Sequence, residues 1–149
     1  SNGKIGYNDV NNSVGLGCSY KSDQLLFEGG LMVGDGITRV ADVVRGTPAQ
    51  DQDFSSIQNV QFNPPYVSAK DLIGTIDDSP LASPLNLEII QRSYAYANAP
   101  DDKYVIVSYT IKNTGFIPLN NLYAGLFADW DIDNAMVNMS GYDASRALG

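Results

Sequence analysis

Strict alternation of side-chain character is the feature that most constrains the fold of this chain. In residues 104–112 (YVIVSYTIK), Val105, Val107, Tyr109 and Ile111 occupy every second position. Successive side chains of a β-strand point to opposite faces, so a period of two predicts a strand with one buried face. β-branched and aromatic residues, which strands favour, fill the run. The sequence therefore predicts a strand here, with these four side chains directed toward a core.

The same alternation recurs on both sides of this strand. Residues 87–96 (LEIIQRSYAY) precede it across the turn-rich ANAPDDK, and residues 122–132 follow it across NTGFIPLNN. Polar, proline-containing connections favour antiparallel neighbours. We therefore expect a C-terminal three-stranded antiparallel meander over residues 87–132. On its third strand, the side chains expected to share the buried face are Leu122, Ala124, Leu126, Ala128, Trp130 and Ile132.

The first half of the chain predicts further short strands. Residues 14–20 and 25–34 form an expected hairpin joined by KSDQ, and 37–46 favours a strand over a short helix. Residues 53–62 and 70–78 are two more strand candidates on either side of NPPY. The chain carries 15 Asp against 2 Glu, with 14 Gly and 13 Asn, a composition of turns rather than helices. We expect an all-β, antiparallel β-sandwich of about eight strands.

Residues 1–149 are expected to form one such domain. A chain of this length is an ordinary single domain and can bury a substantial core. The sequence ends in RALG where another strand could begin. We therefore expect the domain to be a fragment of a larger multidomain chain.

Composition excludes several classes of function. No His is present, which removes Ser/His and Cys/His catalysis and His-ligated zinc. The single Cys18 allows no internal disulfide and is expected as a small buried strand residue. The net charge is −8 and the 9 basic residues are scattered, so nucleic acid is not an expected partner. No run of about 20 apolar residues predicts a membrane span.

Carboxylates are the remaining groups with catalytic potential. Glu28 lies within the apolar LLFEGGLMV, where burial would raise its pKa and suit it to act as an acid. Glu88 or one of Asp129, Asp131 and Asp133 would then be its partner in a carboxylate-based hydrolase. The competing interpretation is a solvated strand face with a bulge at Gly29-Gly30. The sequence does not fix the separation of the carboxylates, so the hydrolase is the least favoured interpretation.

Aromatic residues suggest a ligand platform. Tyr94 and Tyr96 share a strand face, and rings placed in this way stack on sugars. Trp130 is a third candidate for such a surface. The competing interpretation is that these rings pair across strands or cover a neighbouring sheet.

The stretch ADWDIDNA (128–135) has the densest group of carboxylates in the sequence. Asp129, Asp131 and Asp133 alternate with Trp130 and Ile132, so on a strand the three carboxylates leave one face about 7 Å apart. If the strand ends earlier, the run resembles the first half of a calcium loop. Ser140 occupies the position where that loop has its bidentate Glu. A calcium site on these aspartates and a solvated strand end both stay open.

Several motifs together resemble a known kind of module. LLFEGGLMVG, ADVVRG, DQDF, YVIVSYTIKNTG, NLYAGLFADWDI and GYD occur in that order over most of residues 14–149. This combination resembles a non-catalytic β-region that lies downstream of the subtilisin-like serine protease domain in large exported bacterial proteins. The resemblance implies a secreted or cell-surface location. It transfers no catalytic residue, since the protease triad would lie upstream.

The sequence thus predicts a non-catalytic structural or interaction module of an exported, protease-containing bacterial protein. Its expected partners are other domains of the same chain and a polysaccharide or protein surface. It requires no cofactor, with calcium as the one candidate ion. The alternative is a carbohydrate-binding module that uses Tyr94, Tyr96 or Trp130.

Overall fold

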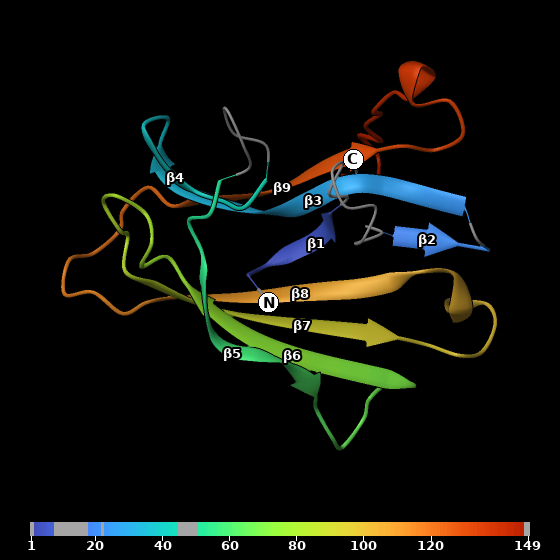
Figure 1. The fold of residues 1–149 in the computed structure, drawn as a ribbon, viewed down its shortest axis with the longest axis horizontal. Coiled ribbons are helices and arrows are strands. Elements are labelled where there is room, and N and C mark those ends of the chain that lie inside the picture. The colour runs from blue at the N-terminus through green and yellow to red at the C-terminus, as the bar shows by residue number, and fades with distance from the viewer. Residues whose placement is uncertain (1, 8–17, 22, 45–50, 148–149) are drawn as a thin grey trace. The chain divides into compact units, whose positions relative to one another are not determined.

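The described part of the chain is all-β. The computed structural model describes residues 2–7, 18–21, 23–44 and 51–147 (Figure 1). The strands are β1 (Lys4–Tyr7), β2 (Cys18–Tyr20), β3 (Asp23–Gly36), β4 (Arg39–Ala41), β5 (Ser55–Phe62), β6 (Lys70–Asp77), β7 (Leu87–Ala95), β8 (Val105–Asn113) and β9 (Tyr123–Trp130). Two 3-10 helices, η1 (Asp101–Lys103) and η2 (Ala135–Val137), accompany them. Among these residues no helix is long and apolar enough to cross a membrane.

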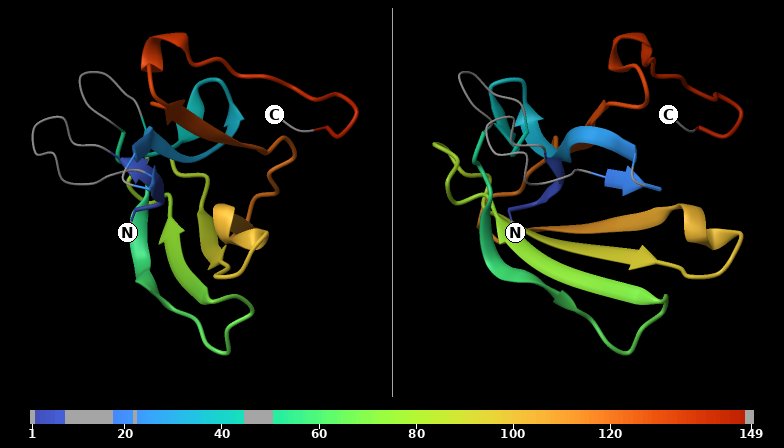
Figure 2. Two further views of the ribbon diagram at one scale, coloured as in Figure 1. Left: turned by 90° about the vertical axis from the view of Figure 1, so that its right-hand side faces the viewer. Right: turned by 45° about the vertical axis from the view of Figure 1, so that its right-hand side comes forward.

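The strands form two antiparallel sheets, as expected for a β-sandwich. One sheet has the order β5-β6-β7-β8, so consecutive strands are neighbours throughout (Figures 1 and 2). In the other sheet the long β3 pairs with β1, β2, β4 and β9. The all-β fold class and the sandwich architecture are therefore confirmed.

The chain divides into two compact units. The first unit comprises Ser1–Lys4 and Gly30–Leu126, and the second comprises Ile5–Gly29 and Phe127–Gly149. Strand β5 through strand β8 lie entirely in the first unit, together with β4 and the second half of β3. The second unit holds β2, the first half of β3, the end of β9 and the C-terminal segment.

The hydrophobic core lies in the first unit and joins residues from both sheets. Leu87 and Ile89 are 1% and 0% exposed, which is the alternation that the sequence of β7 predicts. Tyr109 and Ile111 of β8 pack against this cluster, so the predicted inner face of residues 104–112 is confirmed for these two residues. It is wrong for Val105, which is 60% exposed. The fully buried members of the cluster are Leu31, Val33, Ala41, Val43, Phe54, Ile76, Leu85, Leu87 and Ile89.

The predicted meander over residues 87–132 is wrong in its third strand. Strands β7 and β8 form the expected hairpin, with Leu87 opposite Asn113 and Ala95 opposite Val105. Strand β9 exists, but it pairs with β3 in the other sheet. Residues 114–122 separate β8 from β9, and a connection of that length, longer than a hairpin loop, lets the chain change sheets.

The expected burial of the β9 face is also wrong. Leu126 is 60% exposed and Trp130 is 49% exposed. Alternation fixes which side chains share a face of a strand, but burial requires a second layer over that face.

The first half of the chain matches the prediction in part: β3, β5 and β6 form where strands were expected, but β1 was not predicted. Of the expected strand 37–46 only β4 forms, and residues 45–46 lie outside the described residues. β2 and β3 are antiparallel neighbours, with Tyr20 opposite Asp23. Lys21, in the connection, has a φ of 50°. Residues 14–17 of the predicted first strand lie outside the described residues. Cys18 is a strand residue as expected, but it is exposed rather than buried.

Candidate functional site

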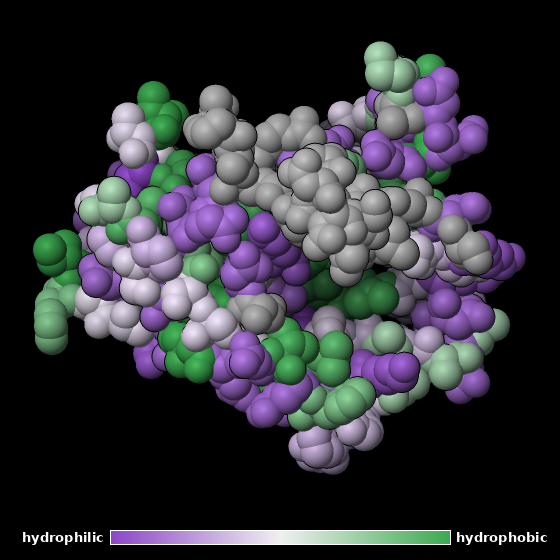
Figure 3. Space-filling model, in the orientation of Figure 1, coloured by the Kyte–Doolittle hydropathy of each residue, from purple (hydrophilic) through white to green (hydrophobic). Residues whose placement is uncertain are grey.

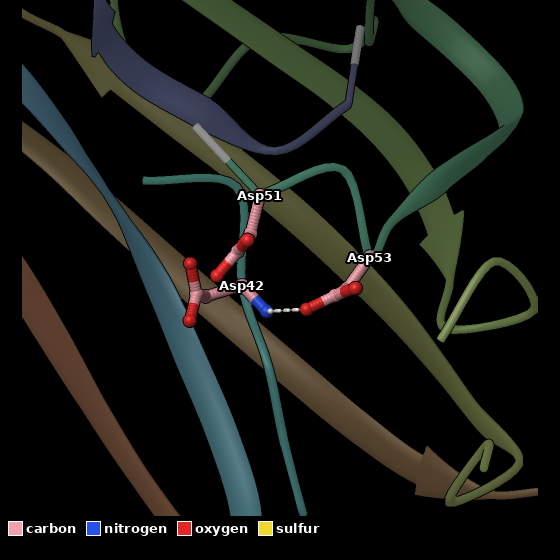
Figure 4. Close-up of side chains that lie close together, drawn as sticks. All are labelled: Asp42, Asp51 and Asp53. Atoms are coloured by element: carbon pink, nitrogen blue, oxygen red, sulfur yellow. Dashed lines mark hydrogen bonds between the residues drawn. The ribbon is translucent and has the colours of Figure 1, made fainter. Parts of the chain in front are cut away.

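Three aspartates come together in the first unit, a group that the sequence did not suggest. One carboxylate oxygen from each of Asp42, Asp51 and Asp53 lies within 4.8 Å of the others (Figure 4). Asp42 directly follows β4, and the other two precede β5. The backbone N–H of Asp53 donates to the carbonyl of Asp42 at 3.1 Å, and that of Asp51 donates to Val44 at 2.9 Å. These bonds hold the two segments side by side.

Local hydrogen bonds engage the carboxylates of this group. Asp42 is 6% exposed, and its Oδ1 accepts a hydrogen bond of 3.0 Å from the N–H of Val44. Asp53 accepts at Oδ2 from the N–H of Asp42 at 3.4 Å. Burial raises the pKa of Asp53, the Asp42 N–H lowers it in part, and the charge of Asp51 raises it further. The net result is that the pKa of Asp53 is raised from its ordinary value.

These three residues have the donor chemistry for a hard cation. Carboxylate oxygens are the ligands that Ca²⁺ and Mg²⁺ prefer. The sequence signal was the D-x-D spacing at Asp51 and Asp53, but nothing in the sequence brings Asp42 beside them. Only the pairing of the segments after β4 and before β5 does so.

The predicted calcium residues lie at the end of β9. The strand ends at Trp130, so Asp129 is a strand residue while Asp131 and Asp133 follow it. Asp133 has a φ of 54°, in the left-handed region, and the chain turns there. The three are not among the described acidic residues whose oxygens lie within 4.8 Å of one another. Whether they bind calcium stays a prediction.

Two asparagines brace the segment after β9. The Nδ2 group of Asn138 donates to the carbonyls of Ile132 and Asn134, each at 2.9 Å. Its Oδ1 accepts from the N–H of Ile132 at 3.2 Å. Asn134 accepts at Oδ1 from the N–H of Met136 at 3.1 Å, at the start of η2. This loop is therefore held by amide side chains that occupy two of its backbone carbonyls.

Trp130 borders a hollow in the second unit. The hollow has a volume of about 520 Å³ and is also lined by Asp129, Ile132, Asn138 and Ser140. A half-exposed indole beside carboxylate, amide and hydroxyl groups is the combination that stacks on a sugar ring and bonds its hydroxyls.

The two predicted platform tyrosines lie at one end of the four-stranded sheet. Tyr94 is in β7 and Tyr96 is just beyond it, and both are half-buried. The ring of Tyr96 lies 6.5 Å from that of Tyr104, tilted by 56°. Tyr96 also lines a second hollow of about 350 Å³ with Ser68, Asn98 and Asp101. Cross-strand ring contact, the competing interpretation, therefore accounts for part of the surface of Tyr96.

The carboxylates of the hydrolase hypothesis have different surroundings. Glu28 is 2% exposed, so it lies in the protein interior and not on a solvated face. A Cβ at the neighbouring Gly29 would lie 3.1 Å from the carbonyl oxygen of Phe127. This close approach of the backbone explains why a glycine occupies position 29. Glu88 lies opposite Lys112, with its Oε1 3.6 Å from the lysine Nζ.

Comparison with known proteins gives no match. No family model matches this chain, and no curated protein or solved structure matches it.

Proposed function

We propose that this chain is a non-catalytic interaction module of an exported, protease-containing bacterial protein, and that it contacts other domains of the same protein. The resemblance of its motifs to β-regions downstream of subtilisin-like proteases supports this context. The absence of His from the sequence supports the non-catalytic assignment. Contact with neighbouring domains is supported by exposed apolar side chains on the segment that follows β9.

The main support for this contact is an apolar surface on the segment that follows β9, here called the C-terminal apolar surface. It consists of Ile132, Met136, Val137, Met139 and Tyr142, and Met136 and Met139 are 90% and 94% exposed. Apolar side chains, green in Figure 3, reach the surface at several places, and single ones are ordinary. Several along one short segment indicate an interaction site.

Hydrogen bonds within this segment hold its backbone in the conformation in which the apolar side chains are exposed. Asn134 and Asn138 hold the backbone around η2 through the hydrogen bonds described above. A loop held in this way presents its methionines in one arrangement before any partner arrives. Less conformational entropy is then lost on binding, which favours association.

Hydrogen exchange of the complete gene product tests the proposal. Amides of residues 132–142 are expected to exchange more slowly in the complete protein than in the 149-residue chain, because a neighbouring domain covers them. Met136→Ser with Met139→Ser should remove this protection. Ile37→Ser is the matched control, because Ile37 is 100% exposed in the turn between β3 and β4. Equal exchange in both proteins would contradict the proposal.

A carbohydrate-binding module is the second candidate, favoured by the hollow beside Trp130. Trp130 is the only tryptophan, so its fluorescence reports on this hollow alone. Titration with neutral oligosaccharides should shift the emission if a sugar stacks on the indole. Asn138→Ala would alter the lining of the hollow, but it would also remove the hydrogen bonds that hold the loop after β9. Ser140→Ala is therefore the better variant, and it should weaken the fluorescence change caused by sugar. An unchanged emission spectrum at millimolar sugar would reject this candidate.

A further inference from the structure

The two edges of the four-stranded sheet differ sharply. Strands β5 and β8 are its outer strands, and among the described residues no strand pairs with the outer edge of either. The register of β5 shifts twice against β6, between Ser56 and Gln58 and between Gln58 and Gln61. Such bulges are a usual protection of an edge against pairing with another chain.

Strand β8 has none of these protections. Its nine residues pair one-to-one with β7 from Val105 to Asn113, without a register shift. It contains no proline, and no charged residue occurs from Tyr104 to Ile111. Val105 is 60% exposed and Ile106 is 43% exposed. A long, regular edge that is rich in β-branched residues and uncharged up to Ile111 is a template for another strand.

We propose that β8 pairs with β8 of a second copy of this chain, antiparallel about a two-fold axis at Ser108. The alternate residues Val105, Val107, Tyr109 and Ile111 are apolar or aromatic, and the only charged residue of β8, Lys112, lies next to its end, so the central part of the strand is self-complementary, as a two-fold interface requires. This joins two four-stranded sheets into one continuous sheet of eight strands.

Side-chain pairing selects Ser108 as the centre. An axis there places Val107 opposite Tyr109 and Val105 opposite Ile111 of the second copy, so the inner face stays apolar across the interface. On the outer face, Lys112 lies opposite the ring of Tyr104, a favourable cross-strand pair. Moving the axis to residue 107 would set Ile111 opposite Lys103, and moving it to 109 would set Ile106 opposite Lys112.

Charge at the strand ends favours the same orientation. Asp101 and Asp102 of η1 lie before the strand, with Lys103 and Tyr104 between them and Val105, so this end carries two acidic groups and one basic group. Lys112, 3.6 Å from Glu88 of β7, lies near the other end. Antiparallel pairing brings Lys112 of one copy toward the end of the other that has a net negative charge, whereas parallel pairing would bring like ends together. The occupant is therefore a second copy in antiparallel orientation.

The interface lies in the first unit, whereas the C-terminal apolar surface lies in the second. Self-association through β8 therefore goes beyond the proposed contact with other domains. Because the residues differ, substitutions in β8 and at Met136 and Met139 test the two proposals separately.

Sedimentation velocity of the 149-residue chain tests the pairing. At concentrations up to about 100 µM, we expect the mass to rise from that of the 16.1 kDa chain toward twice that value. The informative variant is Ser108→Asp. Ser108 lies opposite Arg92 on β7, so the new carboxylate is compatible with the folded monomer. In the dimer, two such carboxylates would face each other across the axis and repel. This variant should stay monomeric at every concentration.

The matched control is Ser56→Asp, the same change at an exposed serine on the opposite edge strand β5, and it should dimerise like the unmodified chain. A second variant gives a positive signal. Ser108→Cys with Cys18→Ser should form a disulfide-linked dimer on mild oxidation, because facing residues of paired strands are about 4.5–5.5 Å apart at Cα. A monomeric unmodified chain would overturn the proposal. A dimer that survives Ser108→Asp, or that Ser56→Asp abolishes, would also overturn it.

Discussion

The backbone N–H of Asp131 donates a hydrogen bond of 3.0 Å to the carbonyl oxygen of Leu25. The chain therefore still follows β3 one residue beyond the end of β9. This bond fixes the backbone in the middle of the DWDID stretch against a strand that is distant in sequence. The backbone that carries Asp129, Asp131 and Asp133 is therefore held in place, and substitution of these residues can test whether they bind a ligand.

The first prediction compares a core residue with a half-exposed one. Leu87→Ala should lower the free energy of unfolding by about 2–5 kcal/mol, because Leu87 is 1% exposed and the change leaves a cavity. Trp130→Ala should cost less than the roughly 3–5 kcal/mol of a fully buried tryptophan, because Trp130 is 49% exposed. Urea denaturation measures both. A larger loss for Trp130→Ala would mean that its ring lies in a core.

The second prediction concerns the hydroxyl of Tyr109. This buried atom has no hydrogen-bond partner among the described residues, and burial raises the pKa of Tyr109 to about 12. Removing an unsatisfied buried polar group is neutral or favourable, so Tyr109→Phe should change the unfolding free energy by about 0–1 kcal/mol in the stabilising direction. Tyr104→Phe is the control, since its hydroxyl donates to Asp101 and its loss should not stabilise. Destabilisation by Tyr109→Phe would reveal a partner for its hydroxyl.

The third prediction concerns calcium. A ligand that binds only the folded state raises the melting temperature, so melts in about 5 mM calcium and in chelator should differ if a site of roughly millimolar affinity exists. Loss of the difference in Asp131→Asn, but not in Asp53→Asn, would assign the ion to the DWDID stretch. The reverse pattern would assign it to the group of Asp42, Asp51 and Asp53. Equal midpoints in both solutions would leave neither group with a useful affinity for calcium.

The fourth prediction concerns acid stability. Burial opposes ionisation of Asp71, but hydrogen bonds from Ser68 and Val67 outweigh it and hold the pKa of Asp71 below its ordinary value of 3.8. A lowered folded-state pKa contributes stability that is present above pH 3.8 and lost as the pH falls through the folded-state pKa.

Asp71→Asn should therefore show a flatter decline of melting temperature between neutral and strongly acidic pH than the unmodified chain. Asp102→Asn, at an exposed position in η1, is the control and should leave the decline unchanged. An identical pH profile for Asp71→Asn would show that the ionised carboxylate does not stabilise the fold.

The fifth prediction concerns catalysis. With no His in the chain, we expect no turnover of peptide or ester substrates. Turnover that survives repurification and is abolished by Glu28→Gln or Asp131→Asn would contradict the non-catalytic assignment and revive the carboxylate hydrolase.

The sequence by itself determined the local structure. Alternation predicted β7 and β8 and their hairpin, and it predicted the inward direction of Tyr109 and Ile111, which pack on the core. Turn residues marked most of the remaining strand boundaries. These features depend on the geometry of neighbouring residues along one segment, and the sequence carries that information directly.

Only the tertiary structure decided which strands pair and which faces are covered. Strand β9 was predicted, but its pairing with β3 depends on the path of residues 114–122, and no local pattern specifies that path. The exposure of Trp130 and the grouping of Asp42 with Asp51 and Asp53 have the same origin. Side-chain periodicity assigns a residue to a face, whereas burial and convergence depend on which distant segment packs against that face, because both are set by contacts between residues far apart in the chain.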